Sequence, residues 1–165
     1  MIRILSSTAL ALSLLAAPAI AADMKVKAVE VSADVGSIQN AQAAKYFGNL
    51  KSDLEAAISA RVADRATTSQ SEDGVVISVD VNEVELSNTF QNITNLANTK
   101  LEGNVNVFDK ENTALQSFTL AVSVEQASAF FPAGTDLHAL TLDTPVYYQA
   151  MVNAFADAVV KRLDG

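Results

Sequence analysis

The spacing of apolar and polar residues divides the first half of the chain into two strands with a helix between them. Residues 24–35 alternate β-branched and charged residues and stop at Gly36, a pattern typical of a strand. Residues 40–65 repeat apolar residues at steps of three and four, which predicts one long amphipathic helix. Residues 75–82 alternate again and predict the second strand. The predicted buried stripe of the helix consists of Phe47, Leu50, Leu54, Ala57, Ile58 and Val62.

The second half of the chain predicts a hairpin and a terminal helix. Residues 101–108 and 115–126 flank a stretch rich in turn formers, residues 109–113, and together indicate an antiparallel hairpin. Residues 137–142 predict a short edge strand, and Thr144 with Pro145 supplies an N-cap and a first helical residue. The apolar stripe of this last helix consists of Tyr148, Val152, Phe155, Val159 and Leu163.

This order of elements, β-α-β-β-β-α, favours an α+β fold in the form of a two-layer sandwich. The first two strands, joined through a helix, should pair in parallel, and the others in antiparallel fashion. Each of the last three strands carries one apolar and one polar face, so only one face of the sheet is expected to be dry. We therefore predict a mostly antiparallel sheet with both helices on one face and the other face in contact with water.

An uncharged apolar run near the start of the chain predicts export. Arg3 precedes the run, and residues 18–21 (PAIA) end it with small side chains, as in a secretory signal peptide. We expect cleavage to remove residues 1–21 and to leave residues 22–165 as a single periplasmic or secreted α/β domain of a bacterium, with no stable membrane insertion. The alternative is a retained anchor, because residues 4–22 are nearly long enough to span a bilayer.

Composition narrows the possible partners. The chain contains no Cys, which excludes disulfides, thiolate metal sites and a lipid anchor on a cysteine. Nineteen acidic residues outnumber eleven basic ones, for a net charge of −8. Nucleic acid is therefore not an expected partner, since its binding depends on Lys and Arg neutralising phosphates. Anionic membrane surfaces are disfavoured for the same reason.

Few residues offer catalytic chemistry. His138 is the single histidine, so His-based triads and multi-histidine metal sites are excluded, and no nucleotide-binding or hydrolase motif is present. Asp80 and Glu102 could approach each other on the polar face and act as a hydrolytic carboxylate pair, although ordinary solvated charges explain them more simply. We expect no enzyme activity, no cofactor and no bound metal, with a small carboxylate-dependent hydrolase as the alternative.

The chain resembles small accessory domains of the bacterial cell envelope in its predicted signal peptide and in its order of elements, with residues 101–126 followed by an amphipathic terminal helix. Examples are the amino-terminal domain of the Tol-Pal translocation protein and auxiliary lipoproteins of envelope transport and assembly systems. The resemblance implies a non-enzymatic domain that docks onto other envelope proteins. Such lipoproteins depend on an acylated Cys, which this chain lacks.

The residues suited to recognition are amides on a predicted loop and on the polar sheet face, together with an aromatic pair. Residues 87–99 have no clean period and predict a long, Asn-rich loop whose amides suit sugar or peptide recognition. The predicted partner is an envelope protein or a polysaccharide, and a self-assembling structural protein that pairs through sheet edges is a further alternative. The oligomeric state stays open. The candidate binding residues are Asn88, Asn92, Asn95, Asn98, Asn104, Asn106, Phe130 and Phe131.

Overall fold

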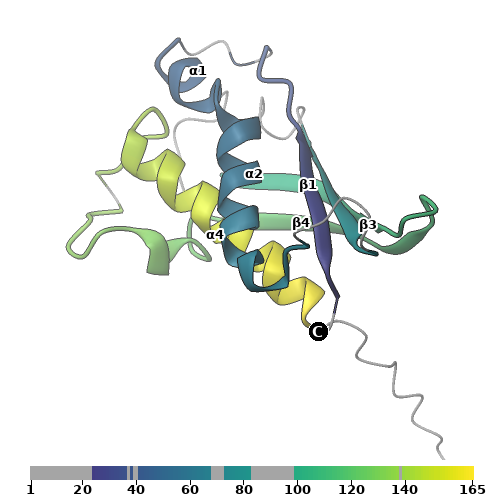
Figure 1. The fold of residues 1–165 in the computed structure, drawn as a ribbon. Helices are drawn as coiled ribbons and strands as arrows, with labels where there is room; N and C mark the ends of the chain where they lie inside the picture. The colour runs from purple at the N-terminus through teal and green to yellow at the C-terminus, as the bar shows by residue number, and fades with distance from the viewer. Residues whose placement is uncertain (1–23, 37, 39–40, 68–72, 83–98, 138) are drawn as a thin grey trace, which may run out of the picture.

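Four strands form one sheet in the computed structural model, and their order in the sheet is their order in the chain (Figure 1). They are β1 (Val26–Ser32), β2 (Val75–Val81), β3 (Lys100–Phe108) and β4 (Ala114–Ser123). β1 pairs with β2 in parallel, whereas β2–β3 and β3–β4 are antiparallel, as the sequence predicts. The residues that the structure describes are 24–36, 38, 41–67, 73–82, 99–137 and 139–165.

The predicted leader, most of the predicted loop 87–99, and His138 lie outside these ranges. No helix within the described ranges is long and apolar enough to cross a membrane.

The sequence predicts one continuous helix over residues 40–65, and this prediction is wrong because the helix is interrupted. The chain forms α1 (Ala41–Phe47) and α2 (Leu50–Arg61), followed by a short 3-10 turn, η2 (Ala63–Arg65). The break falls at Gly48 and Asn49, where the Gly48 N–H donates to the carbonyl of Ala44 at 2.9 Å and ends α1. Glycine and asparagine are both poor residues for a helix interior, so the apolar stripe continues across a bend in the backbone.

The predicted edge strand over residues 137–142 is also wrong. The described residues of this stretch form turns between η4 (Ser128–Phe130) and the terminal helix α4 (Pro145–Leu163). Leu142 is buried in the core, and the hydroxyl of Thr144 donates to the carbonyl of Thr141 at 2.9 Å. The alternation of apolar residues over 137–142 is therefore not that of a strand. It belongs to a turn that is anchored in the core by the side chain of Leu142.

The core lies between one face of the sheet and the helices, which confirms the predicted α+β two-layer arrangement. In Figure 1, α2 and α4 lie on the same side of the sheet. The central strands contribute fully buried residues, among them Ile77, Val79 and Val105, and all five predicted stripe residues of α4 are buried. In the stripe of the first helical region, Ala57 is partly buried and the other five residues are buried.

A glycine lets α4 approach the sheet closely. A Cβ at Gly103 of β3 would lie 3.0 Å from the carbonyl oxygen of Asp80 and 3.2 Å from the ring of Phe155. Phe155 is fully buried at the centre of α4. The absence of a side chain at Gly103 thus allows the largest apolar group of α4 to pack directly onto the backbone of the sheet.

Candidate functional site

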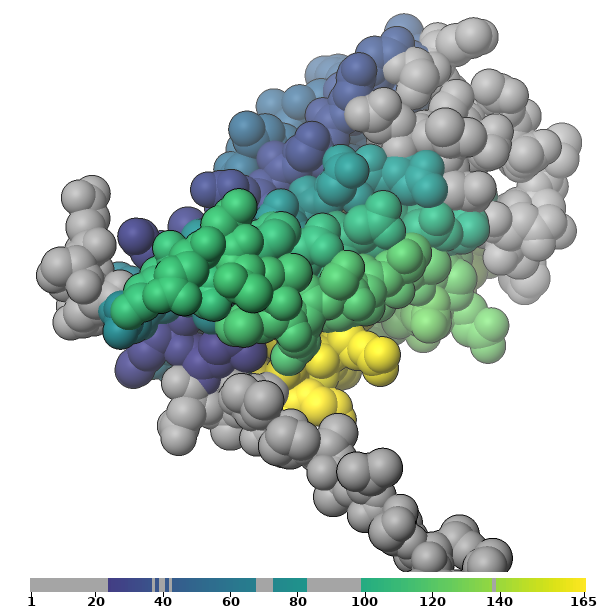
Figure 2. Space-filling view, turned by 90° about the vertical axis from the view of Figure 1, so that its right-hand side faces the viewer, coloured from purple at the N-terminus to yellow at the C-terminus, as the bar shows by residue number. Residues whose placement is uncertain are grey.

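The sheet face opposite the helices is polar and continues across the four strands. Register pairs on this face include Glu30 with Ser78 between β1 and β2, and Asp80 with Asn104 between β2 and β3. We call this surface the open face. In Figure 2 the green surface of β3 and β4 is turned to the viewer, and no described helix covers it. The open face also includes Ser32, Asn82, Lys100, Glu102, Asn106, Ser117 and Thr119.

Hydroxyl groups on β4 fix the amide groups on β3. The hydroxyl of Thr119 donates to Oδ1 of Asn104 at 2.8 Å, and the hydroxyl of Ser117 donates to Oδ1 of Asn106 at 2.7 Å. Each amide oxygen is therefore occupied within the sheet. The amide nitrogen, with its two N–H groups, is the donor that each asparagine offers to a ligand.

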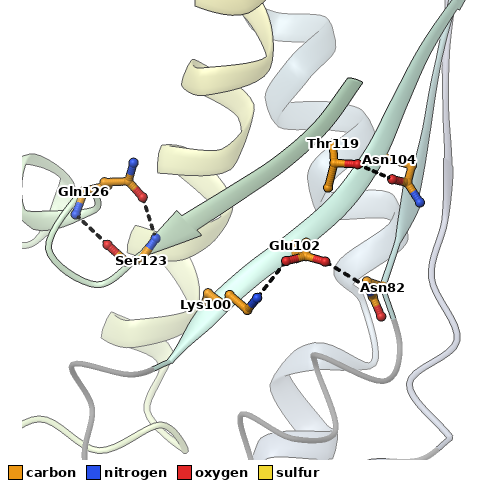
Figure 3. A network of polar contacts seen from close by, with 7 residues as sticks. All are labelled: Asn82, Lys100, Glu102, Asn104, Thr119, Ser123 and Gln126. Atoms are coloured by element: carbon orange, nitrogen blue, oxygen red, sulfur yellow. Dashed lines mark hydrogen bonds and ion pairs between the residues drawn. The ribbon is translucent and has the colours of Figure 1, made fainter. Parts of the chain in front are cut away.

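A charged cluster marks one end of the open face, where β2 ends and β3 begins (Figure 3). Nζ of Lys100 donates to Oε2 of Glu102 at 2.8 Å, and Nδ2 of Asn82 donates to Oε1 of the same carboxylate at 3.0 Å. The hydrogen bond from Lys100 lowers the pKa of Glu102, partial burial opposes this effect, and the bond from Asn82 adds to it. Glu102 is therefore held as a carboxylate whose oxygens are both engaged.

The open face also has a shallow hollow at the end where β2 begins. Its volume is about 290 Å³, and its lining includes Lys27, Glu30, Ser78, Phe108 and Lys110. Lys110 is paired with Asp73 at 3.0 Å on the exposed surface. The hollow combines an aromatic ring with lysines, carboxylates and the hydroxyl of Ser78, a set that suits a polar ligand with some apolar surface.

The structure brings two of the predicted binding residues together and places two others elsewhere. Asn104 and Asn106 lie side by side on the open face, two residues apart on β3. Phe130 and Phe131 lie at η4, partly buried and packed against the core, so they are not part of the open face. The predicted loop residues Asn88, Asn92, Asn95 and Asn98 fall outside the described residues.

Sequence reasoning missed Lys100 as the partner of Glu102. The signal was available, because residues two apart on one strand share a face and opposite charges there attract. It also missed the hollow beside Phe108, which arises only when residues from β1, β2 and the 109–113 turn meet. No local pattern in the chain marks that meeting point.

Asp80 and Glu102, the predicted carboxylate pair, do share the open face. Asp80 is opposite Asn104 and Glu102 is opposite Asn82, so the two carboxylates are diagonal neighbours on adjacent strands. Among the described residues, no cluster of three or more His, Cys, Asp or Glu side chains could hold a metal ion. Oδ1 of Asp109 accepts the backbone N–H groups of Glu111 and Thr113 in the hairpin turn.

Comparisons with known proteins assign the chain to no family. No protein-family model matches it, and no curated protein matches it. Among solved structures, the chain is similar to a candidate lipoprotein from Caulobacter crescentus CB15, at 14% sequence identity and a TM-score of 0.44, over 82% of this chain and 87% of that one. A likeness at this level carries no argument about function.

Proposed function

We propose that this chain is a non-catalytic, exported interaction domain of the bacterial cell envelope, and that its open face binds a protein or polysaccharide partner. The observation that carries the proposal is the open face itself. It extends over four strands, is polar, and is not covered by any helix in the part of the chain that the structure describes.

The fixed geometry of the open face supports a binding role. Thr119 and Ser117 hold the two asparagines of β3, and Lys100 and Asn82 hold Glu102. Because these side chains are already ordered, this chain loses less conformational entropy when a partner binds them. The amide N–H groups at the middle of the face suit the hydroxyl and carbonyl oxygens of a sugar chain or a polypeptide. The hydroxyl oxygens of Thr119 and Ser117, whose protons are donated to the asparagines, can accept from a partner's O–H or N–H groups.

The rival proposal is a small hydrolase that uses Asp80 and Glu102. A general acid in such a pair needs a raised pKa, so that it still carries a proton near neutral pH. The bond from Lys100 lowers the pKa of Glu102 instead, which supports binding over proton donation by this carboxylate. Release of reducing sugar from envelope polysaccharide that disappears in Glu102→Gln would favour the rival.

The proposal that the protein is exported is supported by the signal-peptide pattern of residues 1–21. The proposal that the exported protein carries no lipid is supported by the lack of Cys in the sequence. Both are proposals about the mature protein. An oxidising compartment imposes no cost on a domain whose core is held by packing alone.

Substitution of the open face tests the proposed function. We would compare partner capture from fractionated cells by the wild-type chain and by Asn104→Arg with Asn106→Arg, which places two bulky cations on the face. The matched control is Ser59→Arg with Gln149→Arg, two exposed positions on α2 and α4. The proposal expects a specific partner that the control retains and the face variant loses at equal folded stability. Capture that the face variant retains in full would contradict it.

A further inference from the structure

The two edges of the sheet differ in how they are protected. Edge strands in soluble proteins usually carry charges, prolines or bulges, which prevent pairing with another chain. β1 follows this rule, because it carries Lys27 and Glu30 and its register with β2 is irregular between Val26 and Ala28. β4 does not follow it, since its ten residues, ALQSFTLAVS, contain neither a charge nor a proline. β4 thus has the sequence of a strand that can pair on both sides.

The hydrogen-bond ladder shows which backbone groups of β4 point away from the sheet. The N–H of Asn82 donates to the carbonyl of Glu102 at 2.8 Å, so the even-numbered residues of β3 bond to β2. The backbone hydrogen bonds of successive residues in an antiparallel strand point alternately to the two neighbouring strands. The odd-numbered residues of β3 therefore form their backbone hydrogen bonds with their register partners on β4. The backbone groups of Ser117, Thr119 and Ala121 therefore point outward, and no strand lies beyond β4 among the described residues.

One end of this edge is closed by a side chain. The N–H of Ser123 donates to Oε1 of Gln126 at 2.8 Å, so this outward group already has its partner. In Figure 3, Ser123 and Gln126 face each other at the end of β4. Among the described residues, the regular stretch of β4 with outward backbone groups and no such closure is residues 117–121.

The helix side of β4 is incompletely covered. Phe118 and Leu120 point to the core side but are only partly buried, whereas their neighbour Val105 on β3 is fully buried. Beside them lies a groove of about 350 Å³ between β4, η4 and α4, and its lining includes Phe130 and Ala158 as well as the ion pair of Asp157 with Lys161. In Figure 2 the yellow surface of α4 shows beside the green surface of the strands. The helix side of this edge is therefore partly apolar, with the guanidinium of Arg162 over the ring of Phe118 at 5.7 Å.

We propose that β4 pairs in antiparallel fashion with β4 of a second copy of this chain, about a two-fold axis perpendicular to the sheet. Each chain carries a net charge of −8, which opposes association in general. β4 is the strand at which this repulsion is weakest, because it places no like charges opposite each other in any register. Residues directly opposite in an antiparallel pair share a face, so Phe118 and Leu120 of the two copies meet on the helix side.

The charged β1 edge determines the size of the assembly. When two β4 strands pair, the outer edges of the joined sheet are the two β1 strands, with Lys27 and Glu30 on each. Because these edges are protected, the assembly closes at two copies and does not grow into a fibre. The two open faces then lie on the same side and form one continuous surface. This inference does not depend on the proposed function, since it concerns the edge and not the open face.

Sedimentation velocity of the full exported chain over a wide concentration range tests the proposed pairing. The expected result is a monomer–dimer equilibrium with no larger species. Thr119→Pro removes one outward N–H without removing a bond to β3, and by symmetry it acts twice in the dimer. It should weaken dimerisation at least about tenfold, through two lost backbone hydrogen bonds. Thr119→Ala is the matched control, because it also loses the hydroxyl bond to Asn104 but keeps the N–H, and it should dimerise like the wild type.

A second variant covers the case in which Thr119→Pro does not fold, as judged by circular dichroism. Ala121→Lys keeps every backbone group and adds a charge to an exposed position on β4, and it should also weaken the dimer at least about tenfold. A chain that stays monomeric at all concentrations would overturn the proposal, as would a dimer that folded Thr119→Pro or Ala121→Lys leaves unchanged. Association only in the presence of another protein would show that a foreign strand occupies the edge, and would also overturn self-pairing.

Discussion

Two neighbouring tyrosines at the start of α4 use their hydroxyl groups in different ways. The hydroxyl of Tyr148 donates to Oδ2 of Asp53 on α2 at 2.5 Å, and its ring meets that of Phe47 edge-on at 4.9 Å. The hydroxyl of Tyr147 donates to Oγ1 of Thr99, a buried residue just before β3, at 3.1 Å. One tyrosine therefore joins the two long helices, and the other joins α4 to the sheet.

Tyr148→Phe should lower the free energy of unfolding by about 1–2 kcal/mol, because the lost hydrogen bond has a carboxylate acceptor. Tyr147→Phe should cost less, about 1 kcal/mol, because its partner is a neutral hydroxyl. Urea denaturation at neutral pH measures both values. A Tyr148→Phe protein as stable as the wild type would show that the contact with Asp53 contributes nothing to folding.

The same tyrosines make stability depend on alkaline pH. Burial raises the pKa of Tyr147 to about 12, and burial together with the bond to Asp53 raises the pKa of Tyr148. An unfolded tyrosine ionises near pH 10. Above that pH the unfolded chain loses the phenolic proton while the folded chain keeps it, so the free energy of unfolding falls as pH rises.

Tyr147→Phe should flatten this dependence between about pH 10 and 12, by up to about 1.4 kcal/mol per pH unit. Comparing the variant with the wild type cancels the titration of the lysines, which both proteins share. Denaturation curves at several pH values give the slope of the unfolding free energy against pH for each protein. Equal slopes would rule out the burial of this hydroxyl.

At the candidate site, sequence reasoning could predict the face but not the contacts. Alternation alone places Asn104 and Asn106 on the polar side of β3, because side chains alternate with period two. Their pairing with Thr119 and Ser117 depends on the register of the hairpin. That register includes an irregularity between Val107 and Phe108 and a turn in which Asn112 has a φ of 62°. Neither feature follows from hydrophobic patterning.

At the scale of elements, long periodic segments were predicted well and short ones were not. The strands and the terminal helix follow from patterns of seven or more residues. The break between α1 and α2 was not predicted, because the apolar stripe runs through Gly48 without interruption. The strand predicted at residues 137–142 is wrong because the segment is short. Over so few residues, the alternation of a strand looks the same as a turn that buries one leucine.

The cap of α4 is a prediction that the structure confirms in detail. Oγ1 of Thr144 accepts the N–H of Tyr147 at 3.2 Å, and Pro145 occupies the first helical position. Thr144→Ala should lower stability by about 1 kcal/mol, since it leaves a helix N–H without its partner. Thr144→Ser keeps the hydroxyl and is the control. Equal loss in both variants, measured by thermal unfolding, would assign the effect to packing of the methyl group instead.

At the scale of the whole molecule, the described helices pack on one side of the sheet and leave its other side uncovered. The helices and one face of the sheet together form the core, and the other face of the same sheet is the open face. This division allows an acidic chain without disulfides to be stable while it keeps one sheet face for the proposed binding. Stability resides in the contact between the two layers, and recognition is proposed for the outer face of the sheet.

The proposed export makes a prediction about the mature chain. The intact mass of the protein recovered from the periplasm or medium should lack residues 1–21. A mass that retains these residues in a membrane fraction would favour the retained anchor.

The most direct test of the central claim is site-specific photocrosslinking from the open face in the producing cell. A photoreactive residue at Asn104 lies at the middle of the face, and one at Gln149 lies on exposed α4 and serves as the control. The account predicts a discrete adduct, protein or polysaccharide, from position 104 that is absent from position 149. The same set of abundant adducts from both positions would contradict the claim that the open face is the binding surface.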